Sequence, residues 1–169
     1  MQTIAVTPAG AMPRQLFPQL DAETMITSLI AGVAADLTWE FWARVITPFI
    51  PGVGGPLEPA ALVQSVFGLE SRLVGEIIHL VVGFLFYPLG YLFIARPLQR
   101  LIIPGLPWYL TAAGFGIGLW IFALYVMAHL IAGLPAFLDL IPLAWASCGG
   151  HIIFGLVVGA VVKWREETA

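Results

Sequence analysis

Four long apolar stretches dominate this chain, and each of them contains ionisable residues. They cover residues 24–47, 73–95, 108–132 and 145–163. Each stretch is about 20 residues long, the length that an α-helix needs to cross roughly 30 Å of hydrocarbon. The chain is 60% apolar and only 10% charged, whereas a soluble domain carries about 25% charged residues. The sequence therefore predicts an all-α membrane protein with four transmembrane helices packed as a bundle.

The remaining composition narrows the possible partners and the domain plan. A net charge of −3, with seven Lys and Arg residues in total, leaves no basic face for nucleic acid. Cys148 is the only cysteine, so no intrachain disulfide can form. Residues 1–22 have no apolar core, and we expect them to be a cytoplasmic lead-in rather than a signal peptide. The transmembrane domain is then expected over residues 23–165.

The distribution of basic residues predicts the orientation in the membrane. With four spans, both termini and the loop between the second and third spans lie on one side. That side holds five basic residues, Arg14, Arg96, Arg100, Lys163 and Arg165. The opposite side holds Arg44 and Arg72. Because basic residues accumulate in cytoplasmic loops, we expect both termini in the cytoplasm.

Two apolar loops are expected on the outer side. The first, 48–72, begins with prolines and glycines that break helices. Its second half, Glu58–Leu69, predicts a short amphipathic helix with Pro59 in the first turn. This helix would lie on the membrane surface or tuck over the bundle. The second loop, 133–144, is also apolar, so the two loops are expected to cover part of the outer face.

The ionisable residues inside the spans are expected to converge in the outer half of the bundle. They are Asp36, Glu40, Arg44, Glu76, His79, His129 and His151. Counted from the outer ends of the spans, Glu40, His79 and His151 lie roughly 10 Å deep, Asp36 about one turn deeper and the others about one turn shallower. Ionisable groups are costly in hydrocarbon, so they usually face the bundle interior and mark a site.

Small residues predict the faces on which the spans pack. Spans three and four contain small-x-x-x-small pairs, which let helix backbones approach closely in lipid. These pairs are Gly114 with Gly118 and Gly155 with Gly159. At helical spacing, each pair shares a face with the polar residues of its span, Gly118 with His129 and Gly155 with His151. We therefore expect all four glycines and both histidines to point inward.

Three functions remain open for the polar cluster. The charged groups can simply satisfy one another and set helix register, since Glu40 and Arg44 are spaced i,i+4 and Glu76 and His79 i,i+3. Alternatively, histidines titrate near neutral pH and buried carboxylates shift towards it, which favours a relay or sensor for protons that opens to the outer side. The cluster could also bind a transition metal.

The metal hypothesis has named ligands. The candidates are Glu76, His79, His129 and His151, because carboxylate and imidazole groups suit a transition metal. His79 and His151 have the most similar depths and are the best candidates for axial ligands of a haem. Cys148 and His151 resemble a nucleophile and base, but no nucleophile elbow or oxyanion loop accompanies them, so we favour a function without catalysis.

Three segments resemble the YagU-like family of bacterial inner-membrane proteins. They are SLIAGVAADLTWEFWARVITPFIPG, HLVVGFLFYPLGY and the region from VMAHLIAGLP to GGHIIFG. The order of features is also similar: a first span that ends in charged and aromatic residues, a Pro/Gly-rich outer loop and histidines in later spans. The resemblance implies a small multi-pass protein of the bacterial cytoplasmic membrane with a link to survival in acid.

We therefore expect a polar His/Glu/Asp cluster in the periplasmic half that handles or responds to protons. The competing hypothesis is a structural or accessory subunit of a larger membrane complex, such as a respiratory or photosynthetic one, or a homo-oligomer. The glycine faces distinguish the two. An accessory subunit would expose Gly114, Gly118, Gly155 or Gly159 to lipid or a partner, and an autonomous bundle would bury them.

Overall fold

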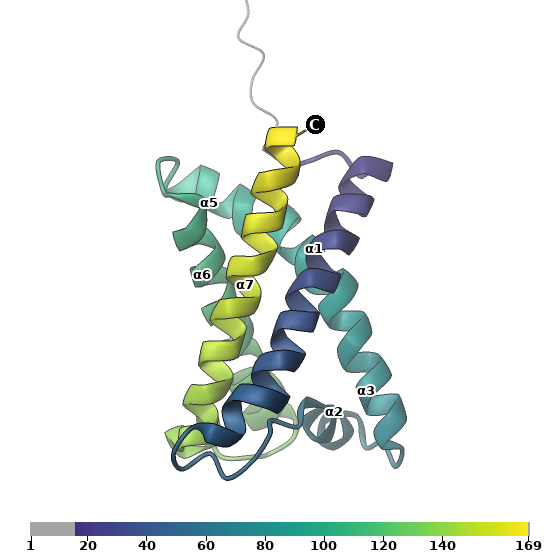
Figure 1. The fold of residues 1–169 in the computed structure, drawn as a ribbon, viewed down its shortest axis with the longest axis vertical. Coiled ribbons are helices and arrows are strands. Elements are labelled where there is room, and N and C mark those ends of the chain that lie inside the picture. Colours follow the sequence, from purple (N-terminus) through teal and green to yellow (C-terminus); the bar gives the residue numbers. More distant parts are fainter. Residues whose placement is uncertain (1–15, 169) are drawn as a thin grey trace, which may run out of the picture.

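The computed structural model describes residues 16–168, and this part of the chain contains helices and no strand. Figure 1 shows long helical rods that run side by side, with the C-terminus at one end and a short helix across the other. Several rods change from α-helix to the wider π-helix along their length. The first rod comprises α1 (Ala22–Phe41), the π-helix η1 (Trp42–Ile46) and the 3₁₀ turn η2 (Thr47–Phe49). The short crossing helix is α2 (Pro59–Phe67).

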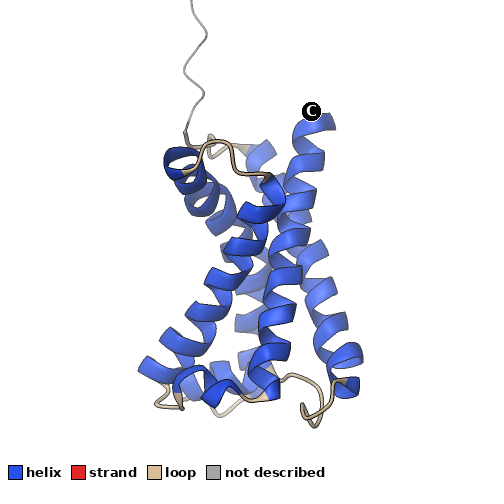
Figure 2. Cartoon of the chain, turned by 90° about the vertical axis from the view of Figure 1, so that its left-hand side faces the viewer, coloured by secondary structure: helices blue, strands red, loops and turns tan. Residues whose placement is uncertain are grey.

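The other three rods follow in chain order. The second consists of α3 (Arg72–Val81), π-helix η3 (Val82–Phe86), α4 (Tyr87–Gly90), π-helix η4 (Tyr91–Ala95) and α5 (Arg96–Ile102). The third consists of α6 (Trp108–Ile121) and π-helix η5 (Phe122–Ile131). After the 3₁₀ turn η6 (Ala136–Leu140), α7 (Pro142–Thr168) forms the fourth rod without interruption. Figure 2 shows loops at the two ends of these rods only.

Three of the four rods are long and apolar enough to cross a membrane, which indicates a multi-pass membrane protein. They are Arg72–Ile102, Trp108–Ile131 and Pro142–Thr168. Each contains one of the predicted spans 73–95, 108–132 and 145–163 almost completely. The predicted span 24–47 is helical too, but it is not one of these three. The predicted lead-in, 1–22, lies largely outside the described residues.

Local chemistry explains where the helices begin and end. Asp21 caps α1, because its carboxylate accepts a hydrogen bond of 2.9 Å from the Thr24 backbone N–H. This bond holds the pKa of Asp21 below its usual value, so the cap is present at neutral pH and is lost as the pH falls through that lowered pKa. Helix α2 has Pro59 in its first turn and ends at Gly68, which adopts the left-handed conformation with φ of 63°. The predicted helix over Glu58–Leu69 is therefore confirmed.

Helix α7 is the element on which both α1 and α6 pack. Close approach depends on glycines that face backbone. A Cβ on Gly116 of α6 would overlap the His151 carbonyl of α7, and one on Gly155 would overlap the Ala112 carbonyl of α6. On the other side, Gly32 of α1 lies directly against the Phe84 backbone of η3. These contacts are the small-residue packing expected between helices in lipid.

The inward faces predicted from glycine spacing are correct for α7 and wrong for α6. Gly155 and Gly159 are buried, whereas Gly114 and Gly118 are exposed, with no atom within 4 Å of a Cβ built on either. The face of α6 that contacts α7 instead contains Ala112 and Gly116. Two small-residue pairs on α6 have the same spacing, Gly114 with Gly118 and Ala112 with Gly116, and only the position of α7 selects between them.

The loop over 133–144 forms a strained corner at the same end of the molecule as α2. Four consecutive residues, Phe137–Leu140, have positive φ values of 49–54°, a conformation that costs L-residues roughly 1–2 kcal/mol each. The Phe137 ring packs against Trp120 and Tyr125, with centroid separations of 4.9 and 5.3 Å. Aromatic packing therefore holds this corner in place, next to the candidate site.

Candidate functional site

A cavity of about 490 Å³ lies at the end of the molecule that α2 crosses. Its walls come from α1, α2, α3 with η3, η5 and α7. The α3–η3 segment packs on α1 and α2 and has almost no contact with η5, so these two rods leave space between them. Most of the lining is apolar. The polar residues among it are Asp36, Trp39, Glu58, Ser65, His79, Tyr87, Ser147 and His151.

Asp36 is the most deeply buried acidic residue of the cavity. Its residue exposure is 2%, and it makes no hydrogen bond or ion pair with any residue between 16 and 168. Its carboxylate lies against Gly83 of η3, where a Cβ would overlap one of the oxygens. Glycine at this position therefore leaves room for the Asp36 carboxylate. Gly83 follows His79 by about one turn, so both lie on the same face of this rod.

Two histidines line the cavity on either side of one tryptophan. The Trp39 ring is 6.4 Å from the His79 ring and 4.6 Å from the His151 ring, measured between centroids. Nδ1 of His151 lies 2.8 Å from the Ser147 carbonyl oxygen. A carbonyl only accepts hydrogen bonds, so Nδ1 carries the proton and Nε2 of neutral His151 is an acceptor. Nδ1 of His79 is buried without a partner.

A network of charged residues lies beside the cavity, next to its lining residues His79 and Glu58, on the side that we call its mouth. The Arg44 guanidinium donates a short hydrogen bond to Glu40 and lies 3.4 Å from the Glu76 carboxylate. Arg72 extends the network, because it lies 3.9 Å from Glu76 and 3.3 Å from Glu58. The predicted pairing of Glu40 with Arg44 is therefore confirmed. These side chains are partly exposed, so individual pairs contribute roughly 0–1 kcal/mol to stability.

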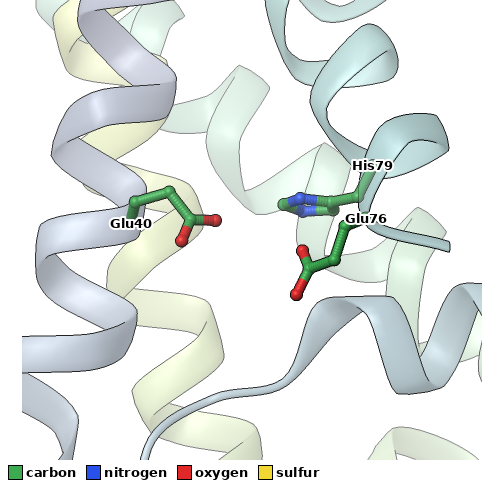
Figure 3. Close-up of side chains that lie close together, drawn as sticks. All are labelled: Glu40, Glu76 and His79. Carbon is green, nitrogen blue, oxygen red and sulfur yellow. The ribbon is translucent and has the colours of Figure 1, made fainter. Parts of the chain in front are cut away.

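Glu40, Glu76 and His79 form a candidate metal centre. Figure 3 shows the Glu40 side chain reaching from α1 towards Glu76 and His79 on α3. One ligand atom from each of the three lies within 4.8 Å of the others. Carboxylate and imidazole groups are suitable for zinc or another transition metal. However, the Arg44 cation already contacts both carboxylates, so it neutralises the charge that would attract a metal ion.

A haem site between His79 and His151 fits this arrangement poorly. The Trp39 indole lies against both imidazoles, so a porphyrin held by the two histidines would have to share this space with the indole. Nδ1 of His151 is hydrogen-bonded to Ser147, which leaves Nε2 as its ligand atom, as is usual for a metal-binding histidine. The position of the Trp39 indole is therefore the feature that disfavours haem here.

His129 and Cys148 do not line the cavity. The protonated Nδ1 of His129 lies 2.8 Å from the Leu134 carbonyl, just beyond the end of η5, and its ring packs on Tyr125 at 5.4 Å. Cys148 packs against the apolar cluster of Trp120, Leu124 and Ala144. Of the seven predicted cluster residues, three line the cavity (Asp36, His79 and His151) and three lie at its mouth (Glu40, Arg44 and Glu76).

Three further residues line the site and were not predicted from the sequence, namely Trp39, Tyr87 and Ser147. Trp39 and Tyr87 carried a usable signal, because both are amphipathic aromatic residues within a predicted span rather than at its ends. Ser147 precedes His151 by one helical turn, the spacing at which its carbonyl can accept a hydrogen bond from the imidazole.

No protein family, curated protein or solved structure matches this chain.

Proposed function

We propose that the chain is a four-span protein of the bacterial inner membrane, of the YagU-like kind, whose cavity takes up protons from the periplasmic side during acid stress. The observation that carries this proposal is Asp36, a carboxyl group 2% exposed that lines the cavity and has no cationic partner among the described residues. Burying an ionisable group in apolar surroundings costs free energy, so such a group usually marks a functional site.

Helix α1 has the surface expected of a fourth span. Its outward face is apolar and its polar residues face the other rods. The exposed apolar residues are Ile26, Leu29, Ile30, Val33, Leu37 and Phe41. Ser28, Gly32 and Asp36 are buried. A helix that is apolar outside and polar inside is suited to lipid, because its charged groups are kept from the hydrocarbon.

The distribution of basic residues supports cytoplasmic termini. Arg96, Arg100, Lys163 and Arg165 belong to the end of the molecule that holds the C-terminus, whereas Arg44 and Arg72 lie near α2. Arg14 was counted with the first group and lies outside the described residues. The excess of basic residues favours this end as cytoplasmic, which puts α2 and the mouth of the cavity on the periplasmic side.

Titratable groups extend from the mouth into the cavity. Glu40, Glu76 and Arg44 face one another at the mouth, and His79 lies beside them on α3. The Trp39 ring packs on both His79 and His151 inside the cavity. A fall in periplasmic pH favours the protonated forms of carboxylates and imidazoles. Changing the charge of a buried group changes the packing that it tolerates, which supplies a response to acid.

Asp36→Asn is expected to reduce survival after an acid pulse to the level of cells that lack the protein. The amide keeps the size of the side chain but cannot ionise, so it cannot take up a proton as the pH falls. Glu23→Gln is the matched control, since it removes an exposed carboxylate from the first turn of the same helix. The measurement is colony recovery at equal protein levels in the membrane. Recovery of Asp36→Asn cells equal to wild type would overturn the proton role.

A labelling experiment can test the fourth span. In a Cys148→Ser background, single cysteines replace Leu20 before α1, Ser65 in α2 and Thr168 at the end of α7, all exposed positions. A maleimide that cannot cross membranes should label Ser65→Cys in intact cells and the other two only after lysis. Labelling of Leu20→Cys together with Ser65→Cys would instead mean that α1 does not cross, because three spans put these two residues on one side.

The competing function, an accessory subunit or a homo-oligomer, is favoured by the exposure of Gly114 and Gly118. A small-residue stripe open to lipid is the surface on which another helix can pack closely. Gly118→Leu should then remove a larger species seen on native electrophoresis while the isolated chain remains folded. A single species of the same size in wild type and in Gly118→Leu would reject this alternative.

A further inference from the structure

We propose that the cavity binds a lipophilic amine, meaning a molecule with an apolar body and a protonated amino group. The inference rests on the cavity of the proposed function and deepens it by naming a class of ligand. Two features of the cavity carry it. One is the size and apolar character of the walls, and the other is the absence of a Lys or Arg side chain from the described lining around the buried carboxylate of Asp36.

The walls are suitable for the apolar body of such a molecule. A volume of about 490 Å³ falls in the range of roughly 300–1,000 Å³ that is typical of sites for drug-sized ligands. Val63 of α2, Val82 of η3 and Phe122 of η5 contribute apolar surface from three sides. Because α3–η3 and η5 scarcely touch, an apolar molecule dissolved in lipid can approach between them.

Several polar groups of the cavity can accept hydrogen bonds. An ionised Asp36 only accepts hydrogen bonds. Nε2 of His151 is an acceptor because Nδ1 donates to the Ser147 carbonyl at 2.8 Å. Nδ1 of His79 is buried and has no partner, and it accepts in one of the two neutral tautomers. The Trp39 indole N–H is a buried donor that also has no partner. A primary ammonium group offers three N–H donors to such acceptors and brings the positive charge that the cavity lining lacks.

Charge points to the same ligand. No Lys or Arg in residues 16–168 lines the cavity, and the nearby Arg44 is already paired with Glu40 and Glu76. A bound ammonium would supply the missing counter-charge for Asp36. The Trp39 ring, which contacts both histidines, adds an aromatic face of the kind that attracts organic cations. A neutral or anionic lipophile supplies no counter-charge for Asp36.

The test compares two probes that differ only in their polar group, 1-naphthylmethylamine and 1-naphthylmethanol. Binding to the purified full-length protein in detergent is measured by titration calorimetry at about pH 8, where an alkyl amine is still charged. Wild type should bind the amine about tenfold more tightly than the alcohol, since hydrogen bonds to charged groups contribute roughly 1.5–3 kcal/mol. Asp36→Asn should bind both probes equally, and Glu23→Gln should keep the preference.

A second variant covers the case in which Asp36→Asn fails to fold. Ala123→Phe fills the cavity from η5 and should weaken both probes while leaving Asp36 intact. Equal affinities for amine and alcohol in wild type, or tight amine binding in Ala123→Phe, would overturn the inference. These results are independent of acid survival. If the protein shows no preference for the amine but cells with Asp36→Asn still fail to survive acid, the proton role stands and the amine ligand is rejected.

Discussion

Gly116→Leu is expected to destabilise the protein by about 3 kcal/mol, the upper end of the usual cost of overpacking, while Gly118→Leu on the same helix leaves its stability almost unchanged. A Cβ on Gly116 would meet the backbone of His151 and Ile152, and helix backbone cannot move aside as a flexible side chain can. The larger leucine would force α6 away from α7 along their shared face. The midpoint of unfolding in denaturing detergent measures the effect.

Gly118 provides a control of the same residue type only two positions away. It is exposed, and nothing lies within 4 Å of a Cβ built there. The same substitution therefore adds surface to lipid without disturbing α7. If both variants unfolded at the same detergent concentration as wild type, the close contact of α6 and α7 would be wrong. If only Gly118→Leu were destabilised, the predicted inward face of α6, with Gly114 and Gly118, would be correct after all.

Arg44→Gln is expected to increase the affinity of the protein for Zn²⁺ by about tenfold or more. The substitution leaves Glu40, Glu76 and His79, whose ligand atoms lie within 4.8 Å of one another, without the guanidinium that now pairs with both carboxylates. A unit charge about 4 Å from a divalent ion costs roughly 2 kcal/mol even at the dielectric constant of water. Removing it therefore favours metal binding, which chelator competition on the purified protein can measure.

Two further variants identify the site of any added metal. Arg72→Gln removes a guanidinium that also approaches Glu76, at 3.9 Å, but has no contact with Glu40, so its effect should be smaller. Adding His79→Ala to Arg44→Gln should abolish the gain, because it removes the only nitrogen ligand of the three. An Arg44→Gln protein that binds Zn²⁺ no more tightly than wild type would show that the three side chains do not converge.

The site could be predicted in part, and the reasons differ between residues. Asp36, His79 and His151 were found because ionisable residues stand out in apolar spans and their depth follows from the rise of a helix. His129 met the same criteria, yet the structure puts it on the Leu134 carbonyl beyond the helix end. The π-helix η5 contributes to this difference, because its wider turns rotate the residues away from the face that a regular α-helix predicts.

Composition and periodicity by themselves predicted four helical spans, of which three have the length and hydropathy to cross a membrane, and a short helix that begins near Pro59. These properties depend on local chemistry, since backbone satisfaction, proline and apolar length act within a few turns of helix. Which faces meet was decided only by the tertiary structure. Gly116 rather than Gly118 contacts α7, and Gly83 makes room for Asp36, because both contacts depend on where another helix crosses, a position that no single helix encodes.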